Sequence, residues 1–127
     1  MSDTNATFWI GVFSIVLRIV QMFPRDSRAR TEDQEKALIA LSSAFHATQH
    51  YYVFLERNKR TNNMENEIAN KWYQVGVLLR KYDKHLANRL DLKSRYWREG
   101  ATWSPSAIRD AGIKLDEVWR EVNVLLK

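Results

Sequence analysis

Hydrophobic positions recur every three to four residues along almost the whole chain, which is the spacing of an amphipathic α-helix. Interruptions of this pattern divide the chain into four predicted helices, at about residues 7–23, 32–57, 64–98 and 105–126. The connections between them are short, and short connections favour antiparallel neighbours. The pattern therefore predicts an all-α fold: one domain over residues 1–127, built as an up-and-down four-helix bundle.

Start and stop signals support these boundaries. A proline ends a helix or opens its first turn, a Ser, Thr or Asn caps a helix start, and a glycine follows a helix end. In chain order the signals are Pro24, the capping-box sequence Thr31-Glu32-Asp33-Gln34, Asn62 or Asn63, Gly100, and Ser104-Pro105. Whether the third helix is continuous or kinks near Asp91 stays open, because Leu90-Asp91-Leu92 fits both.

Three of the predicted helices carry a single apolar stripe that is expected to face the core. The stripes are Leu38, Leu41, Phe45, Tyr52 and Leu55; then Ile68, Trp72, Val75, Leu79, Tyr82, Leu86 and Leu90; and finally Ile108, Ala111, Gly112, Leu115, Val118, Trp119, Val122, Leu125 and Leu126. Gly112 interrupts neither the last stripe nor its spacing. We therefore expect Gly112 to mark a place where two helices pack closely.

The first predicted helix differs from the others because it is apolar over most of its circumference. Its polar positions form one narrow stripe: Thr7, Gly11, Ser14, Arg18, Gln21 and Arg25. This is more apolar surface than one edge of a bundle buries, so the helix is predicted to dock on a second copy or on another protein. The expected contact residues are Phe8, Trp9, Val12, Phe13, Val16 and Ile19; the alternative is that they are core residues.

The same apolar helix raises the question of a membrane. A helix that spans a bilayer needs about 20 mostly uncharged residues, whereas Arg18 interrupts this one. A secretory signal would carry positive charge before the apolar stretch, whereas Asp3 stands there. A helix lying at a membrane surface remains an alternative to bundle packing. Because the chain has no cysteine, a reducing compartment suits it, and the expected location is the cytoplasm.

Composition removes several classes of protein. With 45% hydrophobic and 12% aromatic residues the chain is too apolar for disorder, and four Gly and two Pro are too few for an all-β fold. The lack of cysteine excludes disulfides, iron–sulfur clusters and thiolate catalysis. The sequence also shows no glycine-rich phosphate loop and no nucleophile motif. We therefore expect no cofactor and a function in binding.

His46 and His50 stand four residues apart, so both imidazoles lie on one face of the second predicted helix, as in a helical metal site. A third ligand from another helix would be required, and His85, Asp83 and Glu67 are the plausible donors. The alternatives are two solvated or singly hydrogen-bonded histidines, and a proton-linked switch. No metal is expected.

The net charge is +5, and the excess lies in the middle of the chain. Cations are interleaved there with aromatic residues, a combination that suits phosphates and stacked bases of RNA or another polyanion. The predicted polyanion-binding residues are Arg80, Lys84, Arg89, Lys93, Arg95, Trp97 and Arg98. The alternative is a solvated basic face, since cations are also favoured near a helix C-terminus.

Arg80 and His85 are separated by four residues, Lys81-Tyr82-Asp83-Lys84. This arrangement resembles the short motif of the HEPN superfamily, all-helical ribonucleases of about this length. The resemblance covers these two residues and lacks the polar neighbour that the family favours after its arginine. It implies that Arg80 stabilises a phosphate and that His85 acts as the acid or base in RNA cleavage.

The sequence thus predicts, first, a small non-catalytic accessory or adaptor subunit that binds a protein partner or itself through the first helix. Binding of RNA or another polyanion by the Arg80 to Trp103 surface is the second hypothesis. A helical ribonuclease is the third.

Overall fold

The structure, a computed structural model, describes residues 4–59, 61–90 and 105–127. These residues form helices, and no strand occurs among them. In chain order they include α1 (Thr4–Gln21), the 3₁₀ turn η1 (Ser27–Ala29), α2 (Glu32–Leu55), α3 (Asn62–Leu78) and α5 (Pro105–Leu126). A further helical segment covers residues 84–90. The prediction of an all-α chain is confirmed.

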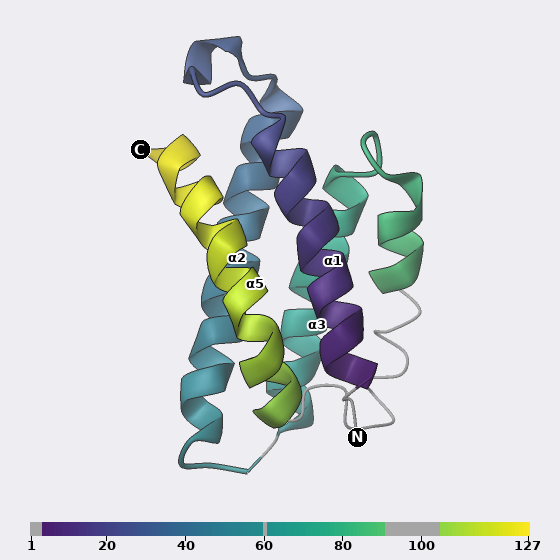
Figure 1. The fold of residues 1–127 in the computed structure, drawn as a ribbon, viewed down its shortest axis with the longest axis vertical. Coiled ribbons are helices and arrows are strands. Elements are labelled where there is room, and N and C mark those ends of the chain that lie inside the picture. The colour runs from purple at the N-terminus through teal and green to yellow at the C-terminus, as the bar shows by residue number, and fades with distance from the viewer. Residues whose placement is uncertain (1–3, 60, 91–104) are drawn as a thin grey trace.

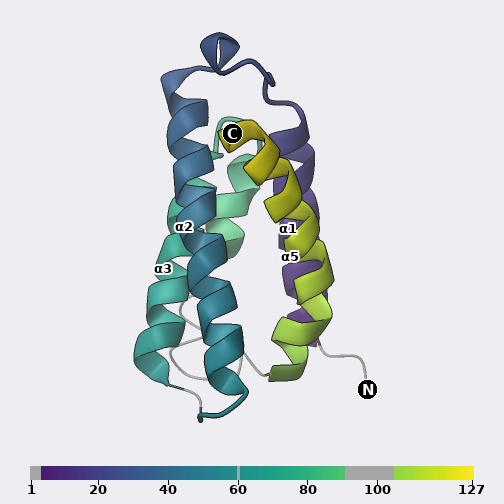
Figure 2. The same ribbon diagram turned by 90° about the vertical axis from the view of Figure 1, so that its left-hand side faces the viewer.

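The helices alternate in direction. Figure 1 shows α1, α3 and α5 running one way, and α2 and the 84–90 segment running the opposite way. As a result α1 and α5, from the two ends of the chain, pack side by side in parallel. In the view of Figure 2, α2 and α3 form one side of the bundle and α1 and α5 the other, with the core between them.

The predicted helix at 64–98 is wrong, because the chain turns at residues 79–83 and then reverses. Five α-helical segments are therefore present in the described residues where four were expected, and the four-helix bundle is not confirmed. An unbroken helix over 64–98 would be about 50 Å long, about one and a half times the length of its neighbour α2, so about a third of its apolar stripe would lack a partner. Asp83 starts the new segment by accepting a hydrogen bond from the His85 backbone N–H at 2.9 Å. The kink proposed near Asp91 lies outside the described residues.

Gly76 explains how the reversed segment fits against α3. A Cβ added to Gly76 would lie 2.9 Å from the Cα of Ala87 and 3.0 Å from a methyl group of Leu90. The two helices therefore approach each other at a distance that only glycine allows. This close contact, which was predicted for Gly112, occurs at Gly76 instead, and nothing lies within 4 Å of a Cβ at Gly112.

The helix starts are capped by side chains. The capping box at Thr31 is present: its hydroxyl accepts the Gln34 backbone N–H at 3.1 Å, and the Gln34 side chain accepts the Thr31 N–H at 3.0 Å. Helix α3 is capped by Thr61, whose hydroxyl accepts the Met64 N–H, rather than by the asparagines that were expected. A start of α5 at Pro105 is confirmed.

Arg30 joins the connection between α1 and α2 to the last turn of α5. Its guanidinium donates to the Glu35 carboxylate at 2.7 Å, to the backbone carbonyls of Pro24 and Arg25 at 3.0 Å, and to the carbonyl of Leu125 at 2.9 Å. The side chain is only 3% exposed. Since the last carbonyls of a helix lack partners within it, Arg30 also caps the C-terminus of α5.

Two buried polar contacts fix α2 against α3. The Trp72 indole N–H donates to the Thr48 hydroxyl at 2.9 Å, and that hydroxyl donates to the Ala44 carbonyl. Tyr51 donates to the fully buried carboxylate of Glu65. Tyr51 is thus a core residue, whereas Tyr52, which the apolar stripe predicted, is half-buried.

No helix in the described part of the chain has the length and apolar character needed to cross a membrane.

The two glycines in the middle of α3 and α5 are expected to respond oppositely to alanine. Gly112→Ala should raise the free energy of unfolding of the single chain by about 1 kcal/mol, because alanine favours helix and no neighbour within the chain opposes its Cβ. Gly76→Ala should lower it by about 1–3 kcal/mol, because the backbone of Ala87 must move. Urea denaturation of both variants measures the two changes in the free energy of unfolding. Changes of the same sign would contradict the packing assigned to Gly76 and Gly112.

Replacing Arg30 by methionine is expected to lower the free energy of unfolding by about 2–3 kcal/mol, since charge-assisted hydrogen bonds to a shielded group are lost together. Arg28→Met is the matched control: among the described residues Arg28 pairs only with Asp26, and its side chain is 89% exposed. Thermal and urea denaturation compare the two. A similar loss in both variants would show that Arg30 does not hold the helix ends together.

Candidate functional site

The predicted contact residues of the first helix lie mostly inside the chain's own core. Trp9, Val12, Phe13, Val16 and Ile19 are all buried, and Phe8 is half-buried against them. The rings of Trp9 and Phe13 contact Trp72 of α3, with centroids 6.2 and 5.0 Å apart. These side chains are buried because α1 contacts several helices, including α5 and α3, and does not lie at an edge of the bundle with one neighbour. The five buried side chains are therefore core residues, which is the alternative that the sequence left open.

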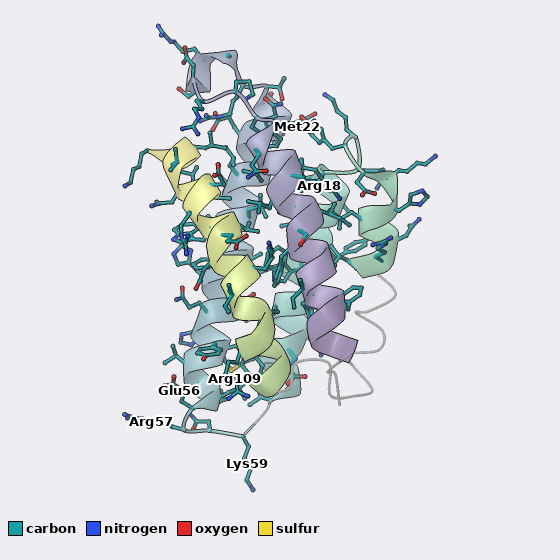
Figure 3. All side chains as sticks on the ribbon, viewed as in Figure 1. Arg18, Met22, Glu56, Arg57, Lys59 and Arg109 are labelled. Carbon is teal, nitrogen blue, oxygen red and sulfur yellow. The ribbon has the colours of Figure 1, made fainter. Side chains whose placement is uncertain are left out.

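The polar stripe of α1 is its exposed face, as the spacing predicted. Gly11, Arg18 and Gln21 are exposed on the helix, and Ser14 is half-buried and donates to the Ile10 carbonyl. Figure 3 shows Arg18 and Met22 on this outer face. Large apolar side chains that are exposed lie on three helices and, at Met22, just after α1: Ile10, Met22, Ile39, Val53, Ile113, Val124 and Leu126.

A cluster of cations surrounds the turn at residues 79–83. Arg80, Lys81, Lys84 and Arg89 are all exposed. Among the described residues none of the four has a carboxylate within 4.0 Å, since the ion pairs found there involve other cations. We refer to these four residues as the basic corner. The charge of the basic corner is available to an anionic partner.

Tyr82 attaches the basic corner to the connection between α1 and α2. Its ring packs against Phe23 with centroids 5.6 Å apart, and its hydroxyl accepts a hydrogen bond from the Gln34 side chain at 2.9 Å. Arg25, two residues after Phe23, is exposed. Figure 1 shows the turn after α3, the connection containing η1 and the C-terminus at the same end of the bundle. The fold thus brings Arg25 to the end that carries the basic corner.

Two acidic residues at this end, Asp26 and Glu32, form ion pairs with nearby cations. Asp26 accepts the Arg28 backbone N–H at 2.9 Å and pairs with the Arg28 guanidinium at 3.3 Å. The backbone hydrogen bond from Arg28, followed by the bond from the Arg28 side chain, lowers the pKa of Asp26, so this carboxylate stays charged and neutralises Arg28. Glu32 pairs with Lys36 at 3.3 Å. Arg28 and Lys36 are therefore less available than the basic corner.

Arg80 and His85 line one open hollow together with Lys81, Tyr82, Asp83 and Lys84. On a regular helix, side chains five positions apart diverge by roughly 140°. The turn at 79–83 removes that constraint, because Arg80 precedes it and His85 lies in the first turn of the next segment. Both side chains are exposed.

His46 and His50 share a groove between α2 and α3 with Glu67 and Lys71. The His46 Nδ1 lies 2.7 Å from the Ser42 carbonyl oxygen, and its ring packs edge-on against Trp119, with centroids 4.9 Å apart. Across the described residues no group of three His, Asp or Glu side chains is arranged to hold a metal ion. His46 therefore contributes to the packing of α2 against α5.

The remaining predicted polyanion-binding residues, Lys93, Arg95, Trp97 and Arg98, lie outside the described residues.

Comparisons with known proteins return nothing: no family model, no curated protein and no solved structure matches the chain.

Proposed function

We propose that this protein binds RNA or a similar polyanion through the basic corner, and that it does so without catalysis. The observation that carries the proposal is that Arg80, Lys81, Lys84 and Arg89 are exposed and have no carboxylate partner in the described part of the chain. Cations without carboxylate partners attract phosphates and release their counterions.

The chemistry of the basic corner favours backbone contact over base recognition. Tyr82 is the aromatic residue in its midst, but its ring is packed on Phe23 and its hydroxyl is bonded to Gln34. The ring is therefore not free to stack on a base. Binding through phosphates alone is sequence-tolerant and strongly dependent on salt.

The burial of the apolar side chains of α1 favours RNA binding at the basic corner over protein binding through α1. An accessory subunit that docks through Phe13 and its neighbours would have to expose side chains that fill the core, whereas the basic corner is already exposed. A protein-binding role for the chain then rests on other surfaces.

Charge reversal at the basic corner tests the proposal. Arg80→Glu with Lys84→Glu is expected to weaken binding of a single-stranded RNA longer than roughly 16 nucleotides at least tenfold. The slope of log K against log salt concentration should become shallower by about 1.4, since about 0.7 is contributed by each phosphate contact. Fluorescence anisotropy over a salt series measures both quantities.

Arg57→Glu with Lys59→Glu is the matched control, because it changes the net charge equally at the opposite end of the bundle (Figure 3). That end lies beyond the screening length of about 10 Å, so RNA binding should be nearly unchanged. Equal weakening in the two double variants would reduce the effect to net charge, and salt-independent binding would rule out phosphate contacts.

A ribonuclease is the second candidate, favoured by one observation: Arg80 and His85 line the same hollow. In this hypothesis Arg80 stabilises the phosphate and His85 transfers the proton. Cleavage of labelled RNA should then be lost in His85→Ala, while anisotropy shows that binding is retained. Full cleavage by His85→Ala would assign the activity to a contaminant.

A further inference from the structure

A hollow opens between α2 and α5. Its volume is about 270 Å³, far above the roughly 30 Å³ that one water molecule occupies. Side chains of α2 and α5 form its walls, and they include Phe45, Gln49, Tyr52, Leu115 and Asp116. Phe45 stacks on Trp119, with centroids 4.6 Å apart.

Gly112 also lines the hollow, and packing within the chain does not account for it. A Cβ at this position would meet nothing within 4 Å, and its backbone has no positive φ. A glycine in the middle of a helix weakens that helix. Neither close packing nor backbone geometry requires a glycine here. Because glycine has no side chain, Gly112 leaves a depression in the surface of α5.

The next residue, Ile113, has a large side chain that protrudes from the surface. Ile113 is 72% exposed, more than any other large apolar side chain described, and it stands at the rim of the same hollow. A protruding isoleucine and a hollow beside it form a knob and a hole on one surface.

The charges around this knob and hole are arranged symmetrically. Arg109 and Asp116 both line the hollow, three positions before Gly112 and three positions after Ile113. With Ile113 they follow the spacing of one helix face. If two copies of α5 cross in antiparallel fashion midway between Gly112 and Ile113, Arg109 of each copy faces Asp116 of the other. The same crossing places Ile113 of each copy over Gly112 of the other.

We propose that the chain forms a two-fold symmetric dimer through this surface, with Ile113 of each copy inserted into the hollow of the other above Gly112. An isologous contact requires such self-complementarity, in which residue i meets residue j and residue j meets residue i. Arg109 and Asp116 carry opposite charges at equal distances from the midpoint of Gly112–Ile113, so this surface is complementary to a second copy of itself. The occupant of the hollow is therefore a second copy of this chain, and the contact does not depend on RNA binding.

Sedimentation equilibrium over a range of concentrations tests the dimer. The unaltered chain is expected to show twice its monomer mass, and Ile113→Asp to shift the equilibrium to monomer, because a carboxylate would be buried in the hollow. Ile39→Asp is the matched control: Ile39 is also highly exposed on the surface of α2 but lies outside the hollow. A monomer at every concentration, or equal dissociation in both variants, would overturn the proposal.

A charge swap tests the antiparallel crossing itself. Asp116→Arg should dissociate the dimer, because it brings Arg109 of one copy against an arginine of the other. Adding Arg109→Asp to the same chain should restore the dimer, since both contacts are then re-formed with reversed sign. Circular dichroism confirms that each variant is helical. A folded double variant that stays monomeric, or an Asp116→Arg chain that stays dimeric, would exclude this contact.

Discussion

Burial of α1 is the constraint on which the remaining structure depends. An 18-residue helix whose surface is apolar except for one narrow stripe needs neighbours on several sides. The chain supplies α5 as a parallel neighbour and Trp72 of α3 as an aromatic contact, and Figure 1 shows the 84–90 segment on the side of α1 away from α5. Leu86 and Leu90 of that segment belong to the same core as Trp9. The reversal at residues 79–83 thus contributes the extra helix that an ordinary four-helix arrangement would lack.

Hydrophobic burial alone does not determine how these helices are aligned, because it has no direction. Alignment is set by a few polar contacts. Arg30 binds carbonyls from both the α1–α2 connection and the end of α5, and the Trp72–Thr48 hydrogen bond joins α3 to α2. The hydrogen bond from the Gln34 side chain to the Tyr82 hydroxyl joins the turn after α3 to the start of α2. Each contact joins two elements at one point, and an unmatched partner would leave a polar group without a hydrogen bond.

Because the apolar side chains of α1 pack in the core, the proposed binding sites lie on other parts of the surface. The basic corner lies at the end where the chain turns after α3, whereas the hollow beside Gly112 lies between α2 and α5. An antiparallel crossing of two α5 helices would direct the two basic corners toward opposite ends of a dimer. An RNA long enough to reach both would then bind more tightly than one corner alone permits.

The sequence by itself determined the helical class, the capping box at Thr31, the start of α5 and most core stripes, because periodicity and capping act within a few residues. It misplaced the end of α3, since the stripe through Leu79, Leu86 and Leu90 keeps its spacing across the turn. The Asp83 cap was the available signal. Only the tertiary structure decided that Gly76 rather than Gly112 is the close contact, that α1 is interior, and that Arg25 lies at the end carrying Arg80. Those outcomes depend on which helices become neighbours, and spacing along one helix carries no information about its neighbours.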